Sequence, residues 1–294
     1  MDPLIVEVRR SGVLEAVHRV HAVAVRDGAV VKEAGDAALT CFMRSSSKPL
    51  QALPLVRARD DLTQEDIAIA TASHRATDEQ LAAAKALLAK ANATEDDLEL
   101  GPQEGRPPQK IYNNCSGKHA GMLALCDANG WPKRGYHEPQ HPVQQACASA
   151  HAEAAGADAA TDFKTGNDGC GVVTFALPLE RMAYAFARLP HLDKADRITE
   201  AMRARPDLIG GPDGADVLLM HHTDAHIAKG GAEGLLCGVD LATGTGYALK
   251  VEDGAFRALT AAAAAFLDVD LPPTDIRNTR GEIVGDVSLR TSTA

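Results

Sequence analysis

The first thirty residues carry the apolar and polar pattern of β-strands. Residues Leu4–Arg9 and Val17–Arg26 alternate apolar and polar side chains or run through β-branched ones, as half-buried strands do. Asp27-Gly28 is a hairpin signal, and the short apolar stretch Ala29–Val31 follows it. The pattern therefore predicts an antiparallel meander at the start of the fold.

The middle of the chain changes to the Ala-rich and Leu-rich composition of helices. Pro49 suits a first helical turn, because the N–H that proline lacks is unpaired there anyway. A helix is therefore expected to begin at about 45–47, and Pro54 should kink or end it. Thr77 and Gln80 have the spacing of a capping box. The remaining helices are predicted at residues 81–92, 113–127 after its start, 140–153, 179–188 and 255–266.

Further strands are predicted in the second half of the chain. Val172–Phe175 follows a Gly-rich loop at 165–171, and residues 232–251 alternate apolar residues with glycine around a turn at 242–246. Strands at both ends and helices in the middle favour an α+β fold, an antiparallel sheet flanked by helices. No repeat or low-complexity linker interrupts the chain, so one domain over 1–294 is expected.

Composition narrows the classes of protein. The chain has 294 residues with 45% hydrophobic and 24% charged residues, which is enough apolar material for a core. The net charge of −10 argues against a nucleic-acid partner. Apolar runs stay well short of the roughly 18 residues of a membrane helix, and the first residues lack the basic and apolar regions of a signal peptide. We expect a cytoplasmic protein whose six cysteines are reduced thiols.

Several common catalytic motifs are absent from the sequence. It contains no H-E-x-x-H, no G-x-x-x-x-G-K-[ST], no G-x-S-x-G and no G-x-G-x-x-G. The sequence therefore disfavours a zincin, a P-loop enzyme, an α/β-hydrolase and a dinucleotide-binding enzyme.

The stretch RSSSKP at 44–49 holds a serine and a lysine three residues apart. Ser45 and Lys48 lie on one face if this segment is helical. A serine hydroxyl becomes a nucleophile when a base takes its proton, and a desolvated lysine is one such base. The alternative is a solvated lysine at the start of a helix.

Two further stretches fit the same chemistry. Ser73 lies at the end of a short apolar segment, 66–71, and His74 follows it directly. Lys229 precedes two glycines and a predicted strand, which resembles the K-T-G signal of S-x-x-K enzymes. The alternatives are a turn serine and an ordinary loop lysine.

Thiols, an amine and a carboxylate occur in two more motifs. Cys115 and Lys118 are three residues apart in NNCSGKHAGM, and Asp168 and Cys170 lie among glycines in GNDGCG. Glycines allow a close approach of the backbone to a ligand. Asp168 suits a substrate ammonium, and Cys170 suits a second thiolate beside Cys115. The alternatives are a capped helix start with a half-buried thiol and a capped turn.

Taken in this order, the motifs resemble those of the asparaginase II family of the rhizobial, thermolabile type. The resemblance runs from residues 6–19 to residues 280–287. It is carried by Arg44-Ser45-x-x-Lys48, Ala72-Ser73-His74, Asn114-Cys115-Ser116-Gly117-Lys118-His119, Gly166-Asn167-Asp168-Gly169-Cys170-Gly171 and Lys229-Gly230-Gly231.

The resemblance implies L-asparagine amidohydrolase activity on a fold similar to those of serine β-lactamases and glutaminases. It implies two Ser–Lys pairs, Ser45 with Lys48 and Ser73 with Lys229. It also implies a zinc site and a homodimer. Separately, the guanidinium of Arg44 is expected to bind the α-carboxylate of the substrate, because it suits a bidentate carboxylate partner. The implied zinc ligands are Cys115, Lys118 and Cys170, with Asp168 beside them at the substrate.

The expected reaction is acyl transfer to serine. Ser45 attacks the side-chain amide of asparagine, Lys48 accepts its proton, and Ser73 is the second choice for the nucleophile. Two rival interpretations remain open at this stage. One is an acyl-transferase of the β-lactamase or penicillin-binding type, although S-D-N is absent. The other is a non-enzymatic protein that binds zinc or another ligand.

Overall fold

The computed structural model describes residues 1–156 and 163–290. The chain folds as two compact units that alternate along the sequence. The sheet unit comprises Met1–Cys41, Pro178–Ala187 and Asp213–Ala294, and the helical unit comprises Phe42–Leu177 and Arg188–Pro212. The expectation of a single domain over residues 1–294 stays a prediction.

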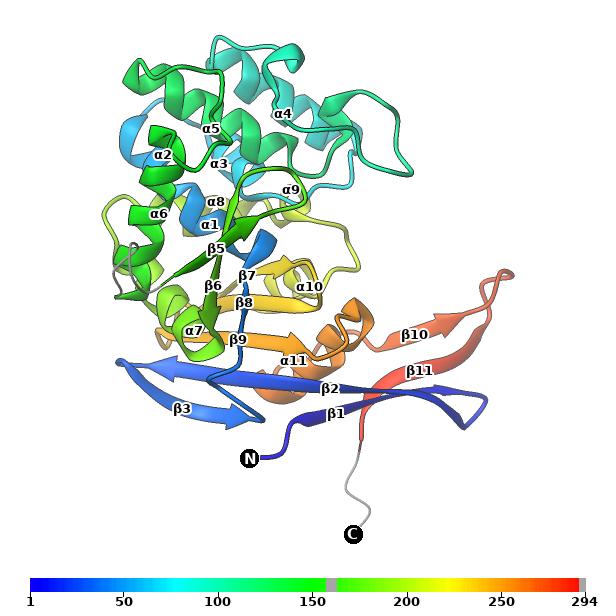
Figure 1. Cartoon of the computed structure of the whole chain (residues 1–294). Helices are drawn as coiled ribbons and strands as arrows, with labels where there is room; N and C mark the ends of the chain where they lie inside the picture. Colours follow the sequence, from blue (N-terminus) through cyan, green and yellow to red (C-terminus); the bar gives the residue numbers. More distant parts are fainter. Residues whose placement is uncertain (157–162, 291–294) are drawn as a thin grey trace. The chain divides into compact units, whose positions relative to one another are not determined.

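The sheet unit is built on an antiparallel sheet with the strand order β10-β11-β1-β2-β9-β8-β7, and β3 pairs with β2 (Figure 1). The two ends of the chain meet in it, because Val8 in β1 lies opposite Val287 in β11. The strands are β1 (Leu4–Arg10), β2 (Val13–Arg26), β3 (Ala29–Ala34), β7 (His226–Gly231), β8 (Leu235–Asp240), β9 (Thr245–Val251), β10 (Thr274–Arg277) and β11 (Ile283–Leu289).

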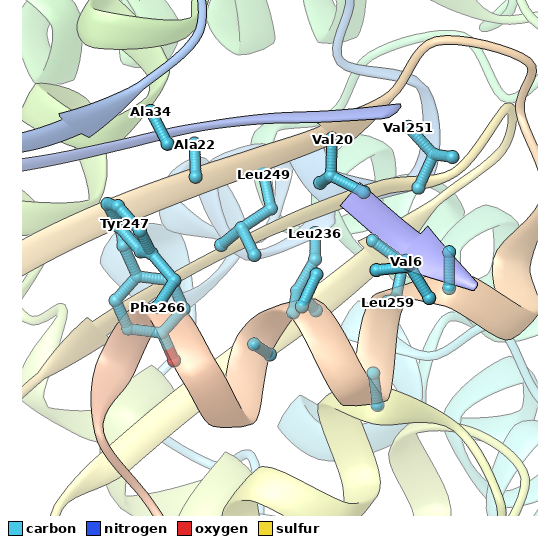
Figure 2. Packing of buried hydrophobic residues seen from close by; sticks show 14 of the residues in the cluster. Val6, Val20, Ala22, Ala34, Leu236, Tyr247, Leu249, Val251, Leu259 and Phe266 are labelled. Carbon is cyan, nitrogen blue, oxygen red and sulfur yellow. The ribbon is translucent and has the colours of Figure 1, made fainter. Parts of the chain in front are cut away.

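Helix α11 (Leu259–Leu267) supplies the apolar cover for one face of this sheet (Figure 2). Tyr247 and Leu249 of β9 project toward it at the two-residue period of a strand, and Phe266 packs against them from the helix. Each large apolar side chain that is fully buried here contributes about 1.5–3 kcal/mol. Packing against α11 therefore explains why apolar side chains recur at every second position of these strands.

Helices α7 (Leu179–Arg188) and α10 (Ala215–His222) complete the sheet unit. Gly246 of β9 is required by α7, because a Cβ at this position would lie 2.0 Å from the carbonyl oxygen of Ala183. The short η5 turn (Phe256–Ala258) leads into α11.

The helical unit begins within strand β4 (Thr40–Phe42), and its other strands form a hairpin. Its elements are η1 (Arg44–Ser47), α1 (Lys48–Gln51), α2 (Leu53–Ala58), α3 (Gln64–Thr71), α4 (Asp78–Lys90), η2 (Glu95–Asp97), η3 (Lys110–Tyr112), α5 (Ser116–Asn129), α6 (Pro142–Ala155), β5 (Lys164–Asn167), β6 (Val173–Pro178), η4 (Leu189–His191), α8 (Asp196–Ala204) and α9 (Pro206–Ile209).

Local signals explain where these helices begin. The Thr77 and Gln80 side chains form the predicted capping box of α4. The apolar segment predicted at 66–71 is the body of α3, which Thr63 and Asp66 cap in the same way. The helix predicted from 45–47 is divided into η1, α1 and α2, and Pro54 lies in the first turn of α2, where a proline is tolerated.

The expected α+β fold with an antiparallel sheet and flanking helices is confirmed. The prediction of a Gly-rich loop at 165–171 is wrong for its first three residues. Residues 165–167 belong to β5 and pair with β6. Among the residues described, no helix has both the length and the apolar character needed to cross a membrane.

Candidate active site

A strained turn presents Ser45. Arg44 has a φ of 49°, in the left-handed region that side chains other than glycine rarely adopt. Strand β6 stabilises this conformation, since the Arg44 N–H donates to Thr174 Oγ1 at 3.2 Å. The Met43 N–H donates to the Phe175 carbonyl at 2.9 Å. Strained backbone of this kind is concentrated at functional sites.

Lys48 follows in the same turn, and its side chain is completely buried. Its Nζ donates to Ser73 Oγ at 3.0 Å and to the Ala72 carbonyl. A buried amine requires such partners, because burial without them is costly. Ser45, the predicted partner of Lys48, is joined to it through the turn, in which the Lys48 N–H donates to the Ser45 carbonyl.

Ser73 lies in the extended segment that follows α3, and backbone hydrogen bonds hold this segment in place. The Ser73 N–H donates to the Ile209 carbonyl at 2.8 Å, and the His74 N–H donates to the Asn114 carbonyl at 3.2 Å. The structure therefore brings Lys48 and Ser73 together from two separate sequence motifs.

Arg44 and Asp168, the two predicted partners for the substrate, form an ion pair with each other. Arg44 Nε donates to Asp168 Oδ1 at 2.6 Å, and the side chains are 27% and 8% exposed. Burial opposes the charge of Asp168, but Lys118 and Arg44 outweigh burial and hold the pKa of this carboxyl below its usual value. The pair supplies one fixed positive and one fixed negative group beside Ser45.

The three predicted zinc ligands also come together, and all three are buried. Lys118 Nζ donates to Cys170 Sγ at 3.0 Å and lies 3.8 Å from Asp168 Oδ2. A hydrogen bond from Cys115 and the charge of Lys118 lower the pKa of Cys170 to about 5. The same hydrogen bond, together with burial, raises the pKa of Cys115 to about 12.

The donor set fits a metal ion of the zinc type. Thiolates are preferred zinc ligands, and an amine binds a metal once it has lost its proton. Burial would lower the pKa of Lys118, but the charges of Cys170 and Cys115 outweigh it and raise that pKa. In the described ranges, no three or more His, Cys, Asp or Glu side chains are grouped to hold a metal, so the set depends on its lysine.

A cleft of about 710 Å³ borders this cluster. Gly169, Cys170 and Gly171 line one part of it, and His137 lines another. The cleft therefore reaches the loop that carries Cys170.

Lys229 lies in the sheet unit, on β7, and is buried. Its Nζ is 3.2 Å from Asp216 Oδ2, and the Gly230 N–H donates to the same oxygen at 2.8 Å. Burial opposes the charge of Asp216, but Lys229 and the Gly230 N–H hold its pKa below the usual value. The predicted pairing of Lys229 with Ser73 joins residues of different units and stays a prediction.

No role was predicted from the sequence for three residues of these sites. Thr174 supports Arg44, Asp216 pairs with Lys229, and the side chain of His74 bonds to Ser116. Only His74 had a signal, its position directly after Ser73. Thr174 is 130 residues from Arg44, and Asp216 is 13 residues from Lys229, and no motif marks either position.

Comparison with known proteins gave one family and several solved structures. A family described as L-asparaginase II matches residues 6–287. A search of curated proteins returned no match to this chain.

Solved structures match this chain at low sequence identity. The protein called Mglu in its native form is 14% identical with a TM-score of 0.48, over 86% of this chain and 65% of its own. A putative beta-lactamase from Bacteroides dorei is 12% identical with a TM-score of 0.46, over 85% and 93% of the two chains. This chain therefore spans about two thirds of the length of Mglu. The expected homodimer and cytoplasmic compartment stay predictions.

Proposed function

Because the chain belongs to the L-asparaginase II family, we propose that it hydrolyses L-asparagine to L-aspartate and ammonia. One observation carries the proposal beyond the family. Lys48 is fully buried and its Nζ lies 3.0 Å from Ser73 Oγ, one helical turn from Ser45. A buried amine in contact with one hydroxyl and close in sequence to a second is suited to proton transfer during acyl transfer to serine.

The substrate is bound through its α-amino-acid group. The Arg44 guanidinium pairs with the α-carboxylate, since its planar N–H groups match a carboxylate. Asp168 pairs with the α-ammonium, because its depressed pKa keeps it charged. Their ion pair in the free protein supports this assignment, since it places both groups beside the turn that carries Ser45. Bound in this way, the substrate presents its side-chain amide to the serines.

Ser45 is the proposed nucleophile. Its Oγ forms a bond to the amide carbon, and Lys48, the proposed base, takes the hydroxyl proton. The Ser45 N–H is the proposed donor to the oxyanion. The C–N bond then breaks, and a proton passed through Ser73 and Lys229 leaves with the nitrogen as ammonia. Water hydrolyses the aspartyl ester and restores the serine.

The second part of the proposal is a zinc ion held by Cys115, Lys118 and Cys170. The buried thiols and amine support it, since Lys118 donates to Cys170 beside Asp168 and Cys115 is hydrogen-bonded to Cys170. When bound, the ion supplies a positive charge that favours the thiolate and neutral-amine forms of its ligands. The charge of Asp168 remains available to the substrate ammonium.

The decisive experiment is a coupled ammonia assay with L-asparagine and L-glutamine. We expect Ser45→Ala and Lys48→Met to lower kcat by about 10⁴-fold, the usual cost of removing a nucleophile or its base. Mass spectrometry should find the trapped aspartyl ester on the peptide that contains Ser45. Near wild-type kcat in either variant would remove the mechanism, and an ester on Ser73 would exchange the roles of the serines. Turnover of a chromogenic β-lactam without ammonia release from asparagine would support the rival acyl-transferase.

Metal analysis tests the zinc site separately. The purified protein should contain close to one zinc per chain, and Cys115→Ser and Cys170→Ser should each lose it. Zinc retained in both variants would place the metal elsewhere. Zinc and asparagine binding without any ammonia release would support a binding protein.

A further inference from the structure

The residue after Ser73 makes a complete set of hydrogen bonds inside the helical unit. His74 is 0% exposed. His74 Nε2 lies 2.8 Å from Ser116 Oγ, and the Ser116 hydroxyl donates its own proton to the Ile111 carbonyl at 2.9 Å. Ser116 Oγ must therefore accept from His74 Nε2–H.

The other ring nitrogen has the opposite role. The Ala76 N–H donates to His74 Nδ1 at 3.1 Å. These contacts assign the Nε2–H tautomer to His74. Burial, reinforced by Lys48 and Arg106, lowers the pKa of His74 to about 3. The ring is thus a neutral connector with one donor and one acceptor near neutral pH.

On one side, His74 stabilises the segment that carries Ser73. Ala76 has a φ of 61°, a left-handed conformation that costs a non-glycine residue about 1–3 kcal/mol. The bond from the Ala76 N–H to the His74 ring therefore supports a strained turn three residues after Ser73. Arg106 adds a bond from its Nη2 to the His74 carbonyl at 3.1 Å.

On the other side, His74 contacts the start of α5. Ser116 is the first residue of that helix and lies between Cys115 and Lys118. The backbone repeats the connection, because the His74 N–H donates to the Asn114 carbonyl at 3.2 Å. Two hydrogen bonds from one residue thus join the Ser73 segment to the motif that contains Cys115 and Lys118.

We propose that His74 is a positioning residue that sets Ser73 Oγ against Lys48 Nζ by bonding the Ser73 segment to Ser116. The proposal rests on the asparaginase function proposed above and adds a residue to it. His74 acts through Ser73 and Ser116. Loss of its bond to Ser116 therefore changes the rate of the chemical step more than substrate binding.

Two substitutions separate the two bonds of the ring. Asn at position 74 reproduces the Nδ1 acceptor but not the Nε2 donor, and Gln reproduces the Nε2 donor. We expect His74→Asn to lower kcat by about 100-fold, the cost of a misplacement near 1 Å, with KM changed less than about threefold. His74→Gln should recover most of the lost kcat. Equal losses in both variants, or a loss seen only in KM, would overturn the proposal.

His151 provides a matched control for the loss of a buried neutral imidazole. It is 1% exposed in the same unit, and its Nδ1–H donates to the Cys147 carbonyl at 2.7 Å. We expect His151→Asn to lower thermal stability as His74→Asn does while keeping kcat. A comparable kcat loss in His151→Asn would show a general effect of destabilisation and contradict the specific role of His74.

The partner side is tested by Ser116→Ala and the double variant. If the His74–Ser116 bond carries the effect, His74→Asn combined with Ser116→Ala loses no more kcat than the worse single variant. Additive losses would contradict the link.

Two measurements keep this inference separate from the proposed function. Wild-type protein that releases no ammonia from asparagine contradicts the function. The positioning role of His74 is then tested by ¹⁵N NMR, which should show the Nε2–H tautomer of His74 in wild type. It is also judged by the crystal structure of His74→Asn, in which Ser73 Oγ should move away from Lys48 Nζ. An Nδ1–H tautomer, or an unchanged separation of 3.0 Å in that variant, overturns the inference.

Discussion

At the scale of single residues, the conformation of Arg44 organises the proposed site. Its left-handed φ costs about 1–3 kcal/mol in a residue other than glycine, so neighbouring contacts must stabilise it. Two of them are the hydrogen bond from its N–H to Thr174 Oγ1 and the ion pair with Asp168. Thr174 is 2% exposed, so water does not easily replace its hydroxyl as a partner for Arg44.

We expect Thr174→Val to lower kcat by about tenfold, because the Arg44 N–H loses its acceptor and a lost buried hydrogen bond costs about 1–3 kcal/mol. Thr174→Ser retains the hydroxyl and should stay within about threefold of wild type. Steady-state kinetics with L-asparagine on the three proteins checks this. Equal rates in the Val and Ser variants would show that Arg44 needs no support from β6.

The reacting groups were more predictable from the sequence than their contacts. Side-chain chemistry and spacing marked Lys48, Cys115 and Cys170, because few other roles suit those residues in those motifs. The contact of Lys48 with Ser73 was not predictable, since 25 residues separate them and α3 determines where they meet. The predicted roles of Ser45 and Lys229 stay predictions.

At the scale of elements, close packing of α5 on α3 positions Cys115 and Lys118. Gly117 and Gly121 are four residues apart and so lie on one face of α5. A Cβ at Gly117 would lie 2.2 Å from the Ile69 carbonyl oxygen, whereas a Cβ at Gly121 would lie 3.1 Å from the Ala70 Cβ. The helix start therefore rests directly on the backbone of α3.

Gly117→Ala should destabilise the protein by about 3 kcal/mol, because the backbone of α3 must move to admit the methyl group. Gly121→Ala should change stability by less than about 1 kcal/mol, since a small gain in helix propensity offsets a tight contact. Urea unfolding of both variants and of Gly101→Ala, whose Cβ would meet nothing within 4 Å, provides the comparison. A loss of stability in Gly117→Ala as small as that in Gly121→Ala would mean that α5 and α3 separate easily.

The positions of helices and strands were predictable where a local sequence signal marks them. The capping box at Thr77 marked the start of α4, and the apolar alternation marked β2 and β9. Strand β5 was missed because its Gly-containing sequence reads as a turn, while its pairing with β6 is a non-local contact.

At the scale of the whole molecule, the chain order conceals the two compact units. The sheet unit takes its residues from three separate stretches, so no composition change marks its boundaries. Its ends close through β1 and β11, a pairing of residues nearly 280 positions apart. Local patterns carry no information on such pairings, and the sequence analysis predicted neither β10 nor β11.

Buried neutral histidines influence the stability of the helical unit. Burial lowers the pKa of His151 to about 4 and that of His74 to about 3, whereas a histidine in the unfolded chain titrates near 6.5. Below about pH 6.5 the unfolded chain binds protons that the folded chain rejects, so stability falls as the pH falls. The stability that these neutral histidines allow is fully present above about pH 6.5, and it is lost as the pH falls toward their pKa values in the folded chain.

We expect His151→Asn to reduce the loss of stability between pH 7 and pH 5 by about 2 kcal/mol, because each histidine of this kind contributes about 1.4 kcal/mol per pH unit below 6.5. Urea unfolding of wild type and variant at the two pH values measures the difference. Carboxylates such as Asp216, whose pKa is held low, lose their contribution at lower pH and act alike in both proteins. If wild type and His151→Asn lose the same stability between pH 7 and pH 5, the His151 imidazole becomes protonated within the folded chain, and its pKa is not lowered by burial.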